Sequence, residues 1–373
     1  MSQLYAGLMS GTSLDGVDGV LVDFSAIRPR VLGHVSAPFP AALKQELLLL
    51  NTSGPDELHR AALAGNALVR VYADVCAQLM RQCQVDASQV RAVGAHGQTV
   101  RHRPHQFDGT GYTVQLNQPA LLAELTGIDV VADFRSRDVA AGGQGAPLVP
   151  PFHQAFFGHL PGITGVLNIG GISNISVLNS DAPDAVIGFD CGPGNALMDA
   201  WCMTHTGAPF DDQGRWAATG GVHGALLQSL LDEPFFTQTP PKSTGRDLFN
   251  GPWLQTKLAG FSDLRPQDVQ ATLAELTARS CADCVLEFAP GSTRLIVCGG
   301  GAFNTHVMTR LEALLPGCVV ASSEAFDLPP LQVEATAFAW LARQCVERKT
   351  ASLKSVTGAR SARILGGVYP SSE

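Results

Sequence analysis

Apolar residues recur along the chain with two different periods, and these divide it into predicted strands and helices. Short apolar runs bounded by glycine, proline or serine predict strands at residues 4–8, 17–24, 31–36, 90–95, 112–116, 128–132, 165–180 (two strands and a turn), 186–190, 293–297 and 318–321. Stretches with apolar positions three and four residues apart predict helices at 41–50, 56–83, 119–126, 195–206, 265–288 and 331–346. The alternation of the two predicts an α/β protein.

The turn between the first two predicted strands is rich in small and hydroxyl-bearing residues. It has the sequence GTSLDGVD at residues 11–18. Small residues let backbone N–H groups approach an anion closely, and hydroxyl groups add donors. Asp15 and Asp18 lie beside these donors, where a magnesium ion with its waters would need carboxylates. The turn is a candidate phosphate-binding loop, although glycine, serine and aspartate also dominate ordinary hairpin turns.

A second hairpin of the same kind opens the second half of the chain. Residues 165–180 again give an apolar strand, a small-residue tip with Gly170 and Gly171, and a β-branched exit strand. The repetition predicts two domains of related topology, which we place at residues 1–133 and 134–373. We expect the end of the C-terminal tail to be loosely packed, with packing back onto the first domain as the alternative.

Polar side chains gather after two strands of the first half. His96, Gln98 and Thr99 follow the strand at 90–95, and Arg135 follows the strand at 128–132. Ligands of α/β folds bind at the carboxyl ends of strands, so both clusters are candidates for ligand contact. Arg135 is the best candidate for binding a ligand carboxylate. The structural alternatives are that His96 bonds a backbone carbonyl and that Arg135 pairs with a neighbouring aspartate.

Two acids of the second half are candidates for catalysis. Asp190 lies just past the predicted strand at 186–190, before a bend and a helix N-terminus, where a general base could be held in place. Glu334 lies in the first turns of an apolar helix, where it either complements the helix dipole or points into a cleft. A glycine-rich turn with Gly299 and Gly300 offers a flat surface to a ring or phosphate, and the loop at 240–250 is either an anion clamp or a solvated turn.

Composition narrows the class of protein. The chain has 373 residues and a net charge of −8, which argues against nucleic acid or anionic lipid as the main partner. The N-terminal residues lack a basic-then-apolar pattern and no uninterrupted apolar run approaches the length of a membrane span, so we expect neither a signal peptide nor a transmembrane segment. The nine cysteines lack disulfide-framework spacing and indicate reduced thiols in a cytoplasm. One CxxC pair, Cys281 and Cys284, is best read as two small buried helix residues, and we expect no protein-bound metal.

The motifs taken together resemble one family. GLMSGTSLDGVD, GAHGQT, ADFR, GGQGAPLVP, LNIGGISNI, FDCGPGN, PKSTGRD, CGGGAFN and EATAFA occur in one order over almost the whole chain. This resembles anhydro-N-acetylmuramic acid kinase, a bacterial enzyme of peptidoglycan (cell-wall) recycling. The resemblance implies the ribonuclease H-like, actin-type ATPase fold, with mixed sheets and ATP in a central cleft between two domains.

The resemblance also implies an activity and the residues that perform it. Such an enzyme opens the 1,6-anhydro ring of 1,6-anhydro-N-acetylmuramic acid with water and phosphorylates O6, giving N-acetylmuramic acid 6-phosphate and ADP. Asp190 and Glu334 are then catalytic, and His96, Gln98, Thr99 and Arg135 bind the amino sugar. ATP with Mg²⁺ is bound by Gly11, Thr12, Ser13, Leu14, Asp15, Gly16, Val17, Asp18, Gly170, Gly171, Gly299 and Gly300. The implied protein is a cytoplasmic homodimer.

Two other functions remain compatible with the residues. The first is a nucleotide-gated binding module of the actin or chaperone type, in which ATP drives domain motion and no sugar is consumed. The second is an ordinary sugar kinase that phosphorylates a free hydroxyl without opening a ring. The carboxylate of Asp190 and the polar cluster at 96–99 favour an enzyme over the binding module.

Overall fold

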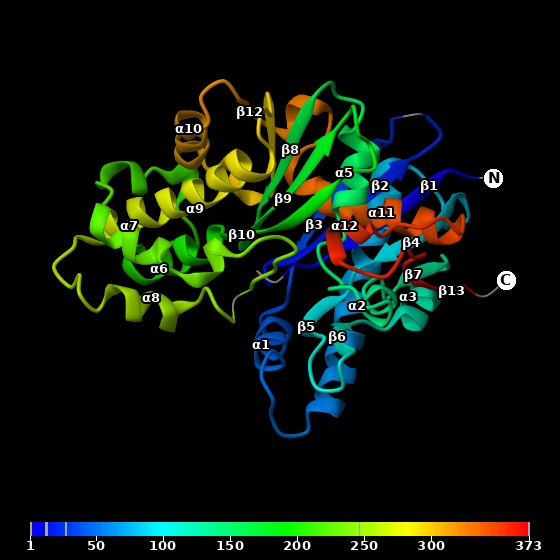
Figure 1. Cartoon of the computed structure of the whole chain (residues 1–373). Coiled ribbons are helices and arrows are strands. Elements are labelled where there is room, and N and C mark those ends of the chain that lie inside the picture. The colour runs from blue at the N-terminus through cyan, green and yellow to red at the C-terminus, as the bar shows by residue number, and fades with distance from the viewer. Residues whose placement is uncertain (1, 12–13, 27, 246, 372–373) are drawn as a thin grey trace. The chain divides into compact units, whose positions relative to one another are not determined.

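The computed structural model describes residues 2–11, 14–26, 28–245 and 247–371. The chain forms two compact units, one made of Met1–Phe156 with Leu331–Glu373 and the other of Phe157–Pro330 (Figure 1). This division lies beyond the predicted boundary at 133/134. Residues 134–156 and 331–373 belong with the N-terminal part, so Glu334 is carried by the first unit.

The first unit is built on a six-stranded mixed sheet. Its strand order is β13-β7-β4-β1-β2-β3, in which β1, β4 and β7 are parallel and the other pairs are antiparallel. The strands are β1 (Leu4–Met9), β2 (Gly16–Asp23), β3 (Arg30–Pro38), β4 (Val90–Ala95), β7 (Val130–Ala132) and β13 (Gly367–Tyr369). A separate two-stranded hairpin is formed by β5 (Gln98–Pro104) and β6 (Gly111–Leu116).

Helices cover both faces of this sheet. One face packs against α2 (Glu57–Cys83), whose Leu68, Val75 and Leu79 join the strand side chains in one cluster. The other face packs against α11 (Val333–Val346) through Phe338 and small alanines. The remaining helices are α1 (Ala41–Leu49), α3 (Pro119–Thr126), α4 (Ser136–Ala140), α5 (Pro150–Phe157) and α12 (Lys354–Thr357), with 3₁₀ turns η1 (Ala87–Gln89) and η7 (Pro330–Gln332).

The second unit is built on a five-stranded mixed sheet in the order β10-β9-β8-β11-β12. Its strands are β8 (Ile163–Ile169), β9 (Ile172–Asn179), β10 (Ile187–Pro193), β11 (Arg294–Cys298) and β12 (Val319–Ser322). Its helices are α6 (Asn195–Thr206), α7 (Gly224–Leu231), α8 (Gly251–Leu258), α9 (Pro266–Phe288) and α10 (Thr305–Leu314). Short 3₁₀ turns complete it: η2 (Asp212–Gly214), η3 (Ala217–Thr219), η4 (Pro234–Thr237), η5 (Gly300–Phe303) and η6 (Ser323–Phe326).

The two sheets share one topology. Each begins with three antiparallel strands in sequence order, and each then adds strands parallel to the first on its other side. The prediction of two related α/β domains with mixed sheets is therefore confirmed, and this repeated arrangement is the actin-type ATPase fold. The similarity between the hairpins at 4–24 and 165–180 reflects this shared topology, because each hairpin forms the first two strands of its sheet.

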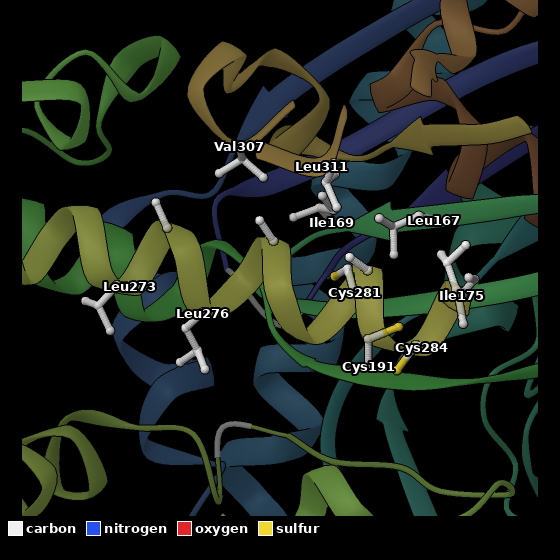
Figure 2. Close-up of a cluster of buried hydrophobic side chains, with 14 of the residues drawn as sticks. Leu167, Ile169, Ile175, Cys191, Leu273, Leu276, Cys281, Cys284, Val307 and Leu311 are labelled. Atoms are coloured by element: carbon white, nitrogen blue, oxygen red, sulfur yellow. The ribbon is translucent and has the colours of Figure 1, made fainter. Parts of the chain in front are cut away.

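The cysteines of the second unit belong to its core. Cys281 and Cys284 lie one turn apart on α9, and both are buried against Cys191 of β10 (Figure 2). Leu167 and Ile175 of the sheet belong to the same cluster. All nine cysteines are free thiols. The interpretation of the CxxC pair as buried helix residues is confirmed.

The C-terminal tail is packed as far as Ser371. The expectation of a loosely packed end is therefore wrong for the tail up to this residue. The side chains of Ala351, Val356 and Ala359 are buried. β13 then adds an antiparallel strand to β7, and both the backbone and the hydroxyl of Ser371 donate to the Asp129 carboxylate. The alternative, in which the tail packs on the first domain, describes the structure, because the tail completes the edge of the first sheet.

Candidate functional site

In each unit the candidate residues collect at the carboxyl ends of the parallel strands. In the first unit Gly11 follows β1, His96 follows β4 and Arg135 follows β7. In the second unit Gly170 follows β8 and Gly299 follows β11. Loops at the carboxyl ends of parallel strands are where α/β folds bind ligands, so the topology gathers each set at one sheet edge.

His96 and Arg135 form a direct pair. Arg135 Nη2 lies 2.9 Å from His96 Nε2, Arg135 Nε donates to the same atom at 3.2 Å, and Nη1 donates to the carbonyl of Gly145 at 2.8 Å. A guanidinium can only donate, so His96 accepts at Nε2 and carries its proton on Nδ1. The histidine is thus a neutral imidazole, and one edge of the Arg135 fork faces it.

Burial and this arginine both suppress protonation of His96. The side chain is only 4% exposed. Burial first, and the charge of Arg135 second, lower the pKa of His96 to about 3, and the nearby backbone of Ser10 and Gly97 partly opposes this shift. His153, on α5, is also buried, and desolvation lowers its pKa to about 3. Both rings are neutral at physiological pH.

These two histidines predict a loss of stability in mild acid. Their pKa is depressed on folding, so their contribution is fully present above the unfolded value of 6.5 and is lost as the pH falls towards 3. Each should cost about 2 kcal/mol of unfolding free energy between pH 7 and pH 5. In urea titrations, His96→Gln should therefore show an acid loss about 2 kcal/mol smaller than the parent chain. An equal loss in both proteins would contradict the assignment.

The predicted phosphate loop of the first unit is described only in part, since Thr12 and Ser13 lie outside the described residues. Leu14 and Val17 are buried in the core, so only their backbone can meet a ligand. Ser10 is also committed, because its hydroxyl bonds Tyr72 at 2.8 Å and the carbonyl of Gly97 at 3.0 Å. Leu14 has a positive φ of 58° and donates its N–H to the carbonyl of Gly11 at 3.2 Å.

The two aspartates of this loop differ in their surroundings. Asp15 is 78% exposed and lies 3.6 Å from Lys44 Nζ. Asp18 Oδ1 lies 3.1 Å from His34 Nε2. No group of three histidine, cysteine or acidic side chains could hold a metal ion anywhere in the described ranges. A magnesium ion would therefore need ligands from a bound phosphate and from water, with Asp15 as the accessible carboxylate.

The sequence predicted that Gln98 and Thr99 lie in the loop after the strand at 90–95. In the structure they are instead the first two residues of β5. The amide of Gln98 donates to the carbonyl of Gly11 at 3.1 Å, so this side chain supports the candidate phosphate loop. Thr99 accepts from the amide of Gln115 at 3.2 Å. The alternation of residue types with period two in QTVRHRP indicates a strand. Its first polar residues were instead predicted to form part of a ligand-binding loop.

A cavity of about 270 Å³ lies beside His96 in the first unit. Of the four predicted sugar-binding residues, His96 is the one that lines it. Its other lining residues are Thr113, Val114, Gln115, Asn117, Pro119, Ala132, Asp133, Ser136 and Tyr369. Sequence reasoning missed most of these polar groups, because a threonine or glutamine on an exposed strand carries no motif.

Glu334 occupies the first turn of α11, where its charge complements the helix dipole. One turn later on the same helix, the ring of Phe338 lies 4.7 Å from that of His96. Glu334 thus lies one helical turn before the residue that contacts His96. Its side chain is half-buried.

The glycine turns of the second unit are held closely by their neighbours. Gly170 and Gly171 form the tip between β8 and β9, and their carbonyls accept from the N–H groups of Asn195 and Ala196 at 2.7 and 3.2 Å. The first N–H groups of α6 are therefore not available to an anion. Gly299 has a φ of 76°, and a Cβ there would lie 2.4 Å from the Asn168 side chain, so this turn requires glycine.

Asp190 lies inside β10 and not past its end. The pairing of β10 with β9 shifts register between Asp190 and Gly192, so a β-bulge at Cys191 re-aims the chain at this point. The loop at 240–244 fixes the acid: Thr244 N donates to Asp190 Oδ2 at 2.9 Å, and Asp190 N donates to the Lys242 carbonyl at 3.2 Å. A carboxylate that accepts a backbone N–H and lies on a paired strand meets the positional requirement of a general base.

Lys242 is neither an anion clamp nor part of a solvated turn. Its side chain is buried, and its ammonium lies 4.8 Å from the ring centroid of Phe235 and 5.8 Å from that of Phe189. These are cation–π contacts, which anchor the loop that holds Asp190. The predicted loop is thus a support for the acid, while Arg246 lies outside the described residues.

Comparisons with known proteins cover almost the whole chain. The family model described as anhydro-N-acetylmuramic acid kinase matches residues 3–371. A protein of that name from Albidiferax ferrireducens is 64% identical, over 99% of this chain and 100% of its own length. Namesakes from Variovorax paradoxus and Cupriavidus metallidurans are 63% and 58% identical, over 99% of this chain and 99% and 98% of theirs. Within the described residues, no helix is long and apolar enough to cross a membrane.

Proposed function

Because the chain belongs to the anhydro-N-acetylmuramic acid kinase family, we propose that it hydrolyses the 1,6-anhydro ring of 1,6-anhydro-N-acetylmuramic acid and phosphorylates O6 with ATP. The products are N-acetylmuramic acid 6-phosphate and ADP. The observation that carries this assignment to residues is Asp190, a carboxylate fixed at a β-bulge by the N–H of Thr244.

The proposed reaction has two linked bond changes. Asp190 accepts a proton from a water molecule while the oxygen of that water bonds to C1 of the sugar. The bond from C1 to O6 breaks in the same step. The O6 oxygen released in this way attacks the γ-phosphorus of ATP, and the bond to the β-phosphate oxygen breaks. Opening the ether delivers O6 as an oxyanion, so the enzyme needs no second base to deprotonate a hydroxyl group. Glu334 is the second proposed catalytic acid.

We assign the binding of the sugar to two side chains and the binding of the ATP phosphates to backbone N–H groups. In the first unit, the Nδ1–H of neutral His96 donates to the sugar, and Arg135 adds a positive charge suited to its lactyl carboxylate. The backbone of the loop at 11–18 and the turns at Gly170 and Gly299 bind the phosphates of ATP. Magnesium would neutralise the phosphates and arrive with the nucleotide.

Isotopic labelling tests the reaction against its alternatives. The purified chain is incubated with ATP and the anhydro-sugar in ¹⁸O-water, and the product is analysed by mass spectrometry with fragmentation. We expect one ¹⁸O atom at C1 at the moment of formation and a phosphate on O6 without label. A chain that phosphorylates free N-acetylmuramic acid but leaves the anhydro-sugar intact is an ordinary sugar kinase. ATP hydrolysis that ignores both sugars identifies a nucleotide-gated module.

We further propose that the enzyme acts in the cytoplasm, where ATP is available, as a homodimer. Exposed leucines on α1 and α2 support a self-association surface, since Leu49, Leu58 and Leu63 are 52%, 89% and 55% exposed. Light scattering of the purified chain should give twice the 39.2 kDa of one copy. A mass of one copy at micromolar concentration would remove this part of the proposal.

A further inference from the structure

The C-terminal segment at 351–360 contacts the loop that positions Arg135. Thr357, the last residue of α12, is 2% exposed although it is polar. Its carbonyl accepts the N–H of Gln144 at 2.7 Å, and the N–H of Arg360 donates to the carbonyl of Ala141 at 3.0 Å. Two backbone bonds thus fasten the tail to residues 141–144, directly before the carbonyl that Arg135 contacts.

A buried side chain connects this contact to the candidate site. The hydroxyl of Thr357 donates to Asp138 Oδ1 at 2.8 Å, and the N–H of Gly145 donates to Asp138 Oδ2 at 2.8 Å. Gly145 in turn accepts Arg135 Nη1 on its carbonyl, and Arg135 Nη2 lies 2.9 Å from His96. The chain of bonds therefore runs from Thr357 through Asp138, Gly145 and Arg135 to His96.

Close packing leaves Asp138 little freedom. Its side chain is fully buried. At Gly143, a Cβ atom would lie 2.2 Å from Asp138 Oδ2 and 3.0 Å from the Cβ of Ala359. Gly143 thus makes room for the carboxyl group between the loop and the tail. A carboxyl group with both oxygens engaged at fixed positions defines where the Gly145 peptide lies.

We propose that Thr357 and Asp138 are positioning residues for the Arg135–His96 pair, so that the C-terminal segment sets the geometry of the sugar-binding residues. Neither residue touches substrate in this scheme. The expected effect on the reaction rests on the proposed function, because it assumes that His96 and Arg135 bind the sugar. The coupling between Thr357 and His96 is a property of the first unit alone and can be measured without substrate.

The test compares Thr357→Val with Thr357→Ser and with the control Thr126→Val. Valine keeps the shape of threonine but loses the hydroxyl, whereas serine keeps it. Thr126 is a second buried threonine of the same unit, and its hydroxyl donates to the Leu122 carbonyl at 2.8 Å within one helix. Thr126→Val therefore reports the general effect of losing a buried hydroxyl group.

Two readouts decide the matter. The first is the titration of His96 by NMR, identified by comparison with His96→Gln. In Thr357→Val the pKa of His96 should rise from about 3 towards 6.5, because Arg135 and its shielding loop are released, while Thr357→Ser and Thr126→Val keep the low value. The second is kinetics: the KM for the anhydro-sugar should rise about tenfold in Thr357→Val with the KM for ATP unchanged.

A purely structural role predicts a different pattern. In that case Thr357→Val and Thr126→Val would lower the melting temperature alike, with the His96 pKa and both KM values unchanged, and the proposal would be overturned. Gly143→Ala, which displaces the Asp138 carboxyl group without touching Thr357, should reproduce the His96 shift and serves if Thr357→Val does not fold. A shifted His96 pKa in a chain that phosphorylates no anhydro-sugar would retain the coupling and reject the proposed function.

Discussion

Asp190→Asn should remove nearly all turnover of the anhydro-sugar while ATP binding persists. A general base contributes about 10²–10⁴-fold, and asparagine cannot accept the proton from water, so kcat should fall about 10³-fold. The amide oxygen can still accept the N–H of Thr244, which keeps the 240–244 loop in place. Nucleotide affinity, measured by calorimetry with a non-hydrolysable ATP analogue, should change by less than about threefold, because the substitution leaves the local geometry in place.

Asp211→Asn provides the matched control. Its carboxylate also accepts backbone N–H groups in the second unit, from Trp216 at 2.8 Å and Ala217 at 2.9 Å. This substitution should cost stability and leave kcat nearly unchanged. If Asp190→Asn turned over the anhydro-sugar at the parent rate, Asp190 would lose its role as the base, and the support it receives from Thr244 would be only structural.

Much of the fold could be predicted because both units obey local patterns. The helices α3 and α6 begin and end where the periodicity placed them, and most strand boundaries agree within two residues. The repeated hairpin predicted two related sheets. Strand β5 was missed because it opens with two polar residues, the buried Gln98 and the half-buried Thr99, at a position where the pattern predicts a loop.

The site could be predicted only as a set of residue types. His96 and Arg135 are 39 residues apart and Thr357 and Asp138 are 219 apart, so no spacing rule relates them. The sequence placed His96 and Arg135 near strand ends, and the topology of the sheet brought these two together. What Arg135 faces was open between a ligand and a neighbouring aspartate, and the structure adds a histidine. Such contacts depend on packing of distant segments, which local patterns do not encode.

The division of the chain was also beyond local patterns. The boundary at 133/134 was predicted from the repeat of the hairpin in the second half of the chain. In the structure the first unit also includes residues 331–373, which come after the second unit in the sequence. The reason lies in α11, which packs on the first sheet. A glycine in β1 and another in β4 let the helix backbone approach the strands directly.

The second large effect is expected at one of these glycines. At Gly94 a Cβ atom would lie 2.1 Å from the carbonyl oxygen of Phe338 and 2.8 Å from its carbonyl carbon. The obstacle is helix backbone and not the end of a flexible side chain, so α11 as a whole must move. Overpacking of a well-packed core costs about 1–3 kcal/mol and sometimes more, and we expect Gly94→Ala to cost at least about 3 kcal/mol of unfolding free energy.

The loss should extend to the site, because α11 carries Glu334 and packs the ring of Phe338 against that of His96. Chemical denaturation gives the stability change, and kinetics at a temperature where the variant remains folded gives the change in kcat. Gly367→Ala is the control, since this strand glycine of the same unit has nothing within 4 Å of an added Cβ atom, and it should be neutral. If Gly94→Ala were as stable as Gly367→Ala, the helix would not rest on the sheet backbone, and the position of Glu334 would need another explanation.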